Sequence, residues 1–245
     1  MEQAYFSMTL AGVPLAYRPV FFQTPRCFGG FCQPWSGQGP VISLTAEELA
    51  QARPIYPPDM RDEALEFNVL TAKTSDALLP FDRCLFHGVA FLWREKAWIF
   101  TAPSGTGKST QYVLWKILYG QELTILNGDK PALECRPDGQ VWVHPSPWTG
   151  KEGMGRLKSA PLGGVIYLSQ GQENAIAPLP LRQAVIPIFS QFLFTASTPA
   201  AVRQVAAIEE RLLRAAPVWR LQNRGDEASA RLTHDTILHF EEGRL

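Results

Sequence analysis

A glycine-rich segment, APSGTGKST, occupies positions 102–110 and leaves few folds open to this chain. It matches the phosphate-loop pattern Gly-x4-Gly-Lys-Ser/Thr, with Ala102 in place of the first glycine. A β-rich run over 97–101 precedes it, and a helical pattern over 108–119 follows and stops at Gly120. Glycines let consecutive backbone N–H groups face an anion, and the helix adds the positive end of its dipole. The segment therefore predicts an anion-binding turn between a strand and a helix.

The positions of this segment have distinct expected roles at a nucleoside triphosphate. Lys108 is expected to contact the β- and γ-phosphates, and the Ser109 hydroxyl is expected to ligate Mg²⁺. The residues expected to bind the nucleotide are Ser104, Gly105, Thr106, Gly107, Lys108, Ser109 and Thr110. No Asn-Lys-x-Asp motif for guanine occurs in the sequence, so a GTPase is disfavoured. The segment predicts a site for ATP with Mg²⁺, but a phosphate loop does not separate a kinase from a motor or a switch.

Alternating apolar runs and turn residues predict further elements along the chain. The expected strands are 5–10, 13–17, 89–93, 97–101, 123–126, 141–144 and 162–168, and the expected helices are a short one opened by a capping box at 45–48, then 108–119, 182–196 and 200–215. Strands interleaved with helices indicate an α/β or mixed core. We divide the chain into a small β-rich N-terminal lobe, 1–80, and a nucleotide-binding domain, 81–245.

Charge and apolar content exclude several classes of partner. Lys plus Arg (23) equals Asp plus Glu (23), so no net field attracts nucleic acid or an anionic membrane. Residues 1–80 carry 5 basic and 8 acidic residues and the remainder carries 18 and 15, so a mildly acidic lobe is expected beside a mildly basic core. The start of the sequence lacks a secretion pattern, its apolar runs are too short to span a bilayer, and its four cysteines lack metal-ligand spacing. A cytoplasmic protein with free thiols is expected.

Three features together resemble the HPr kinase/phosphorylase family, whose nucleotide-binding core is shared with the ATP-dependent phosphoenolpyruvate carboxykinases. They are His87, which stands fifteen residues before Ala102, the segment 102–110, and the run NGDKP at 127–131. The likeness covers about residues 84–180. It is nearest to compact, divergent relatives, some encoded with lasso-peptide clusters, that phosphorylate a Ser of a peptide. It implies a mixed sheet with flanking helices, ATP and Mg²⁺, and often a homo-oligomer.

The resemblance also implies roles for residues near the segment. Asp129 is expected to be the catalytic base or a metal ligand, and His87 either contacts the γ-phosphate or tunes Asp129. With Lys108, these residues form the predicted catalytic set. Gly128 stands where the family has the first of two carboxylates, which argues against the reverse phosphorylase activity.

A loop rich in Gly and Pro at 145–153 supplies the remaining candidates. Glu152 is a candidate Mg²⁺ ligand in place of the carboxylate missing at position 128, so the predicted metal set is Ser109, Asp129 and Glu152. Basic candidates for neutralising phosphate are Lys151, Arg156 and Lys158. Trp148 is a stacking candidate, although a packed loop tryptophan is the alternative.

The expected activity is transfer of the ATP γ-phosphoryl group to a hydroxyl. The acceptor expected is a Ser or Thr of a peptide or small protein, with neither nucleic acid nor a membrane as partner. Two alternatives stay open: a kinase of a small-molecule hydroxyl, and an ATP-binding regulatory protein whose catalysis is impaired by the loss of the paired carboxylate.

Overall fold

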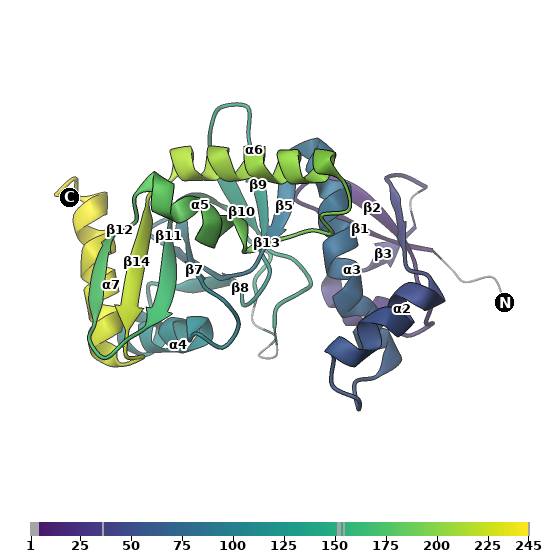
Figure 1. Cartoon of the computed structure of the whole chain (residues 1–245), viewed down its shortest axis with the longest axis horizontal. Helices are drawn as coiled ribbons and strands as arrows, with labels where there is room; N and C mark the ends of the chain where they lie inside the picture. Colours follow the sequence, from purple (N-terminus) through teal and green to yellow (C-terminus); the bar gives the residue numbers. More distant parts are fainter. Residues whose placement is uncertain (1–4, 36, 151–152, 154, 245) are drawn as a thin grey trace.

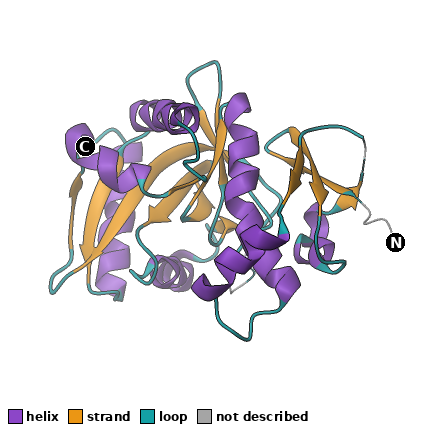
Figure 2. Cartoon of the chain, turned by 45° about the vertical axis from the view of Figure 1, so that its right-hand side comes forward, coloured by secondary structure: helices purple, strands orange, loops and turns teal. Residues whose placement is uncertain are grey.

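Two β-sheets, each with parallel and antiparallel pairs, form the framework of the chain, and helices flank them (Figure 1, Figure 2). The architecture is taken from a computed structural model, which describes residues 5–35, 37–150, 153 and 155–244. The chain is therefore a mixed α/β protein, as the alternation of strand and helix patterns predicts.

The smaller sheet is built from the N-terminal part of the chain in the order β3-β1-β2-β4. Its strands are β1 (Phe6–Leu10), β2 (Val13–Arg18), β3 (Gln33–Pro34) and β4 (Val41–Ser43). The predicted hairpin of β1 and β2 is confirmed, because Leu10 pairs with Val13 across a turn in which Ala11 and Gly12 both have positive φ, 49° and 79°. This left-handed turn matches the twist of the two strands.

Helices and 3₁₀ turns of the N-terminal part cover the smaller sheet and join it to the larger one. They are α1 (Thr24–Cys27), α2 (Ala46–Ala52), α3 (Asp62–Leu78) and the 3₁₀ turns Gly29–Phe31, Arg53–Ile55 and Leu79–Phe81. The capping box is confirmed, since Thr45 Oγ1 accepts from the Glu48 backbone and Glu48 bonds back to Thr45.

Helix α3 was not predicted from the sequence. Its buried face mixes leucines with polar residues, among them Glu66, Thr71 and Thr74, and therefore shows no clean apolar stripe. The polar groups are satisfied by partners distant in sequence. Tyr17, for example, shares a hydrogen bond of 3.0 Å with Thr74, and Glu66 accepts from the backbone of Val20 and Phe21. Helices of this kind depend on tertiary contacts that a periodicity argument does not see.

The larger sheet runs β13-β5-β9-β10-β11-β7-β6-β8, and β14 pairs with both β11 and β12. Its strands are β5 (Arg83–Phe86), β6 (Val89–Trp93), β7 (Lys96–Thr101), β8 (Thr124–Asn127), β9 (Ala132–Cys135), β10 (Val141–His144), β11 (Ala160–Gln170), β12 (Ala175–Pro178), β13 (Phe192–Leu193) and β14 (Val218–Asn223). The hairpin of β6 and β7 and the strands around 123–126, 141–144 and 162–168 are confirmed. Strand β7 is parallel to β11, and β11 is parallel to β14.

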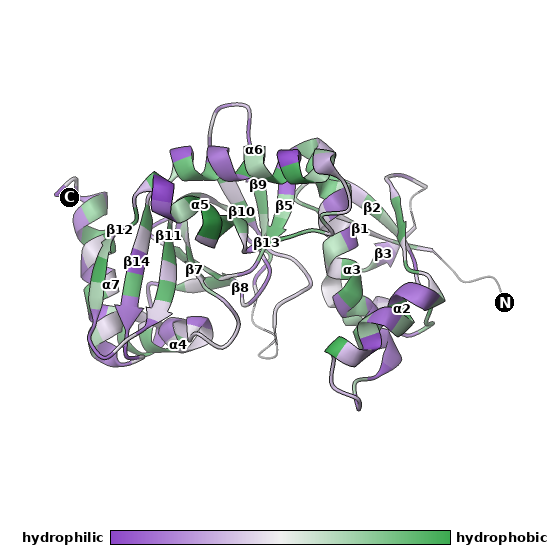
Figure 3. Cartoon of the chain, viewed as in Figure 1, coloured by the Kyte–Doolittle hydropathy of each residue, from purple (hydrophilic) through white to green (hydrophobic). Residues whose placement is uncertain are grey.

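Helices cover both faces of this sheet, and the alternation along β7 shows how. Ala97 and Ile99 point into one core, which α5 (Leu181–Phe189) and α6 (Pro199–Ala215) close. Trp98 and Phe100 point into the other, which α4 (Lys108–Tyr119) and α7 (Glu227–Glu241) close. Figure 3 shows hydrophobic and hydrophilic residues alternating along α6, as expected of a helix with one buried face. None of the helices in the described ranges combines the length and apolarity that crossing a bilayer requires.

One local prediction near the C-terminal end was wrong. The helix expected over 182–196 ends at Phe189, because the chain turns and Phe192 pairs with Phe86 as strand β13. Here a partner distant in sequence outweighs the local pattern. Further on, Asp226 is the N-cap of α7 and accepts from the Ser229 backbone at 3.0 Å.

Candidate functional site

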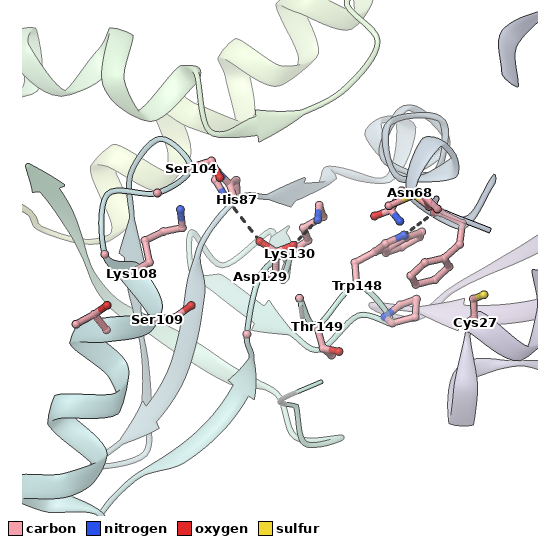
Figure 4. A pocket seen from close by; sticks show the side chains of 18 residues that line it. Cys27, Asn68, His87, Ser104, Lys108, Ser109, Asp129, Lys130, Trp148 and Thr149 are labelled. Atoms are coloured by element: carbon pink, nitrogen blue, oxygen red, sulfur yellow. Dashed lines mark hydrogen bonds and ion pairs between the residues drawn. The ribbon is translucent and has the colours of Figure 1, made fainter. Parts of the chain in front are cut away.

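A cavity of about 740 Å³ lies between the glycine-rich segment, the turn after β8 and helix α3 (Figure 4). The predicted residues that line it are His87, Ser104, Gly105, Gly107, Lys108, Ser109, Thr110 and Asp129. The other lining residues are Cys27, Met60, Phe67, Asn68, Gly128, Lys130, Pro147, Trp148, Thr149 and Gly150, and among these Trp148 is the stacking candidate named from the sequence. The tertiary structure thus brings the N-terminal helices and the glycine-rich segment to one cavity.

The glycine-rich segment forms the turn between β7 and α4. Gly105 and Gly107 have φ of 79° and 106°, values that favour glycine, and Gly107 is the N-cap of α4. Ala102 is fully buried in the aromatic core beneath the turn and its φ is not positive, so this position has no need of the usual glycine. The N–H groups of the first turn of α4 therefore begin at the cavity, where an anion is favoured.

Lys108 is the first residue of α4 and lies across the mouth of this turn. Its Nζ donates to the carbonyl oxygens of Ala102 at 3.0 Å and Pro103 at 3.3 Å, and the residue is only 8% exposed. Burial lowers its pKa, the nearby Asp129 carboxylate raises it and Lys130 lowers it, with a net decrease. The ammonium group is held by weak neutral acceptors, which a phosphate oxygen would replace with a much stronger partner.

Asn127, at the end of β8, holds the turn that presents Asp129. Its side-chain Oδ1 accepts from the backbone N–H groups of Asp129 (2.9 Å) and Lys130 (2.7 Å), and its Nδ2 donates to Ser146 O at 3.0 Å. The side chain is fully buried. This is an Asx-turn closed by a second loop, and it fixes the backbone from which the carboxylate extends.

Asp129 stands between a lysine and a histidine. Its Oδ2 pairs with Lys130 Nζ, and its Oδ1 lies 3.6 Å from His87 Nε2 (Figure 4). The Gly88 N–H donates to the Asp129 carbonyl at 2.8 Å, so the start of β6 and the turn after β8 are joined through the backbone as well. The predicted pairing of His87 with Asp129 in space therefore exists.

His87 is held from its other side by Gln191, which the sequence did not indicate. Nδ1 lies 3.2 Å from Gln191 Oε1, and the His87 N–H donates to the Gln191 carbonyl at 2.8 Å. Burial lowers the pKa of His87, the positive charge of Lys108 lowers it further, and Asp129 opposes both. At neutral pH the ring is therefore uncharged. When Nδ1 donates to Gln191, the Nε2 lone pair faces Asp129.

The far wall of the cavity is neutral and partly aromatic. Trp148 is buried, stacks on Phe67 with ring centroids 5.4 Å apart, and donates from Nε1 to the Phe67 carbonyl at 2.8 Å. Asn68 and Cys27 lie on the same side of the cavity as Trp148 (Figure 4), and Met60 also lines the cavity. Most of the Trp148 side chain is therefore packed in the core, as the alternative to stacking on a ligand predicts, but the residue still borders the cavity.

Of the loop at 145–153, residues 147–150 line the cavity, and the basic residues that follow the loop do not. Arg156 and Lys158 line a separate cavity of about 490 Å³ beside Tyr112 and Thr124, so their predicted place around the phosphates is not supported. Lys151 and Glu152 lie outside the described residues. Thr106 borders another cavity, on the side of the glycine-rich segment where β11 and β14 end.

The donor set facing the cavity suits a magnesium ion carried in with a nucleotide. Within the described ranges, no group of three or more His, Cys, Asp or Glu residues is placed to hold a metal alone. Mg²⁺ characteristically binds through one or two protein oxygens together with substrate phosphates and water. The Ser109 hydroxyl and the Asp129 carboxylate, both on the cavity, fit that requirement.

Residues of α1 and α3 and the positioning residues Asn127 and Gln191 were missed from the sequence. The Asn-Gly-Asp run at 127–129 does carry a signal, because Asn followed by Gly is typical of Asx-turns. No comparable pattern marks Phe67 or Asn68, which reach the cavity through the packing of α3 on the larger sheet.

Comparison with known proteins yields a weak structural likeness. No protein-family model matches the chain, and no curated protein matches its sequence. Among solved structures, the chain resembles the Hpr(Ser) kinase/phosphatase from Coxiella burnetii, with a TM-score of 0.37 and 11% identity, over 64% of this chain and 98% of that one. Such a low score leaves any assignment of function to the geometry of the cavity.

Proposed function

We propose that the chain is an ATP-dependent kinase that transfers the γ-phosphoryl group to a hydroxyl, most naturally a Ser or Thr of a peptide or small protein. The observation that carries the proposal is that Lys108, Asp129 and His87 line one cavity with the start of α4. Phosphoryl transfer requires alignment and charge neutralisation more than covalent chemistry by the protein. These residues supply both.

The cationic end of the cavity suits the triphosphate. Lys108 and the N-terminus of α4 neutralise phosphate oxygens, and Lys130 lies beside them with its charge shared with Asp129. When bound, Mg²⁺ would be held by Ser109 and Asp129 and would supply additional neutralisation of phosphate charge. The HPr kinase/phosphorylase pattern has two carboxylates at this place, and this chain has Asp129 alone. In this proposal, Asp129 therefore both holds the metal and faces the acceptor hydroxyl.

Asp129 and His87 are placed to receive the proton of the acceptor hydroxyl. As the new oxygen–phosphorus bond forms, the bond between the γ-phosphorus and the bridging oxygen breaks and ADP leaves. The proton of the hydroxyl passes to Asp129 Oδ1, where the uncharged His87 Nε2 at 3.6 Å shares it. Gln191 orients the ring from its other side.

The neutral end of the cavity favours a peptide over a phosphorylated small molecule. Cys27, Met60, Phe67, Asn68 and Trp148 offer apolar surface and an amide but no cation. A sugar phosphate would need a cation at its own phosphate group, whereas a Ser beside an apolar residue matches this wall. This lining supports a peptide acceptor over a phosphorylated small molecule.

The proposal is tested by incubating the protein with γ-labelled ATP and Ser-containing peptides, and by following release of phosphate to water, which needs no known acceptor. Asp129→Asn is expected to lower both rates at least about 100-fold while ATP still binds. Lys108→Ala is expected to weaken ATP binding with the fold retained. Lys116→Ala, on the exposed side of α4, is the matched control and is expected to change neither.

The regulatory alternative predicts a different pattern. ATP would bind, no peptide would be labelled, and Asp129→Asn would leave the slow release of phosphate unchanged. If ATP does not bind to the wild-type chain, both the kinase and the regulatory protein are excluded.

A further inference from the structure

The glycine-rich segment borders a second cavity, of about 590 Å³, which has no part in the chemistry described above. Gly105, Gly107 and Thr110 belong to both cavities. The rest of the second cavity is lined by Thr106 and by residues at the ends of two other strands, namely Gln170, Gly171 and Gln172 at the end of β11 and Asn223, Arg224 and Gly225 at the end of β14. The glycine-rich segment therefore forms a wall of both cavities.

Sheet order places these spaces on opposite sides of the turn. Strand β8 is antiparallel to β6, which is antiparallel to β7, so β8 runs parallel to β7; β11 and β14 also run parallel to β7. All four strands therefore end at one edge, where β11 and β14 point toward α4 (Figure 1). In the order β14-β11-β7-β6-β8, Asp129 follows β8 on one side and the second cavity follows β11 and β14 on the other. Ligands of open α/β sheets bind at this edge.

Hydrogen bonds hold the backbone of the second cavity in place. Gly171 donates its N–H to the Asn223 carbonyl at 3.1 Å, and a Cβ at Gly171 would clash with Gln222. Gly225 has a φ of 77° and faces Thr110. The Asn223 amide is used on both ends, accepting from Gln111 at 3.2 Å and donating to the Ser169 carbonyl at 3.1 Å. The Gln222 side chain covers Gly171, whereas at Gly225 no atom would lie closer than 4.0 Å to a Cβ, so a planar group can approach the backbone there.

Arg224 is held at the edge of this surface with its guanidinium oriented. Nε and Nη2 contact Asp226 Oδ2 at 2.8 and 2.6 Å, and its backbone N–H donates to Asn174 Oδ1 at 2.9 Å. Asp226 is fixed in turn by Asn174 and by capping α7. Hydrogen bonds of a guanidinium lie in its plane, so the side chain, 52% exposed, keeps its faces free for a ring.

We infer that this second cavity is the nucleobase subsite and that the purine of the bound nucleotide stacks on Arg224 while its phosphates extend along the common turn to Lys108. The inference rests on the proposed nucleotide site but not on phosphoryl transfer. Stacking on a guanidinium is tolerant of base identity, and both ends of the Asn223 amide are already bonded. The subsite therefore favours purines over pyrimidines and distinguishes adenine from guanine only weakly.

The test compares the dissociation constants of ATP, GTP, CTP and inorganic tripolyphosphate by calorimetry. The wild-type chain is expected to bind ATP and GTP at least about tenfold more tightly than tripolyphosphate, with CTP between them. Arg224→Ala is expected to remove most of that difference and to leave tripolyphosphate binding unchanged. Arg224→Lys retains the charge and a partner for Asp226 but lacks the planar face, so it is expected to behave like Arg224→Ala.

Controls separate this inference from the kinase proposal. Arg220→Ala, an exposed arginine on β14 outside the second cavity, is expected to bind all four ligands as the wild type does. Equal weakening of ATP and tripolyphosphate by Arg224→Ala would make Arg224 a phosphate contact and overturn the inference. So would unchanged binding of ATP, or wild-type behaviour of Arg224→Lys. A kinase that fails to transfer phosphate while showing the expected binding ratios would refute the proposed function alone.

Discussion

At the scale of single residues, Asn127 decides where the carboxylate of Asp129 lies. Its fully buried side chain joins the turn after β8 to the loop at Ser146 through hydrogen bonds. Asn127→Ala leaves the Asp129 N–H and the Ser146 carbonyl without these partners, whereas the Lys130 N–H keeps its bond of 3.1 Å to the Trp148 carbonyl. We expect a loss of about 2–3 kcal/mol in the free energy of unfolding and a fall in phosphate release larger than any change in ATP affinity. Urea unfolding and the labelled-ATP assay measure the two effects.

Ser146→Ala is the comparison for that prediction. It removes a hydroxyl that bonds Asn127 and the Lys130 carbonyl but keeps the bonds from Asn127 Oδ1 to the turn. It should cost stability with less effect on phosphate release. Equal effects of the two substitutions on phosphate release would show that Asn127 does not position Asp129.

Glu209 is a buried acidic residue of α6 that contacts the end of α5 at Phe189. It is 4% exposed and its Oε1 has no hydrogen-bond partner within the described part of the chain. Burial raises its pKa from 4.5 to about 7, opposed by a hydrogen bond from the Phe189 backbone. Between these values the folded chain binds more protons than the unfolded one, so stability falls as pH rises from about 4.5 to about 7.

Glu209→Gln is expected to remove this pH dependence. The wild type should lose on the order of 2 kcal/mol in unfolding free energy between pH 5 and pH 8 from this group, and the variant should lose correspondingly less. Glu210→Gln, an exposed neighbour paired with Arg214, serves as the control. Parallel pH profiles of the wild type and Glu209→Gln, measured by urea unfolding, would contradict the assignment.

At the scale of elements, strand β11 packs so closely against two tryptophans at Gly164 that only a glycine fits at this position. A Cβ at Gly164 would lie 2.7 Å from the rings of both Trp98 and Trp219. Gly164→Ala is therefore expected to cost about 1–3 kcal/mol of stability by overpacking. Gly30→Ala, at a site with open space around it and no positive φ, is expected to be close to neutral. Thermal unfolding of the two variants tests this, and equal melting temperatures would refute it.

At the scale of the whole molecule, the N-terminal part and the larger sheet share a core. Leu85, Ala132 and Trp148 pack in the same cluster as β1, β2 and α3. Arg83 Nε also donates to the Ala11 carbonyl at 2.7 Å. The division of the chain into 1–80 and 81–245 stays a prediction. Because the two parts share a core, we expect that residues 81–245 do not fold stably alone.

Expression of residues 81–245 alone tests that expectation. Exposing Trp148 and Leu85 removes about 1.5–3 kcal/mol of burial for each, so the fragment should be aggregated or partly unfolded on size-exclusion chromatography and circular dichroism. It should also bind ATP more weakly, because Phe67 and Asn68 leave the cavity wall. A monomeric, cooperatively unfolding fragment would show instead that 81–245 is an independent domain.

The elements with strong local signals could be predicted, and those without them could not. The hairpins at 5–18 and 89–101, the capping box and the limits of α4 follow from turn residues and periodicity within a few positions. Helix α3, with its polar buried face, and strand β13, whose pairing with β5 ends the preceding helix, depend on partners far away in the chain. Hydrophobic periodicity is a local property of the sequence and does not indicate which distant segments will pair or pack together.

For the candidate site, the glycine-rich segment could likewise be predicted from the sequence, whereas the residues around it could not. Residues 102–110 determine their own conformation, because a strand, two glycines in positive φ and a helix start are local features. The meeting of Lys108 with Asp129 and His87, and the walls added by Phe67 on one side and Arg224 on the other, were decided by sheet order and by the packing of α3. Contacts between residues distant in the chain are formed by burial of shared surface, and that is settled only when the whole chain folds.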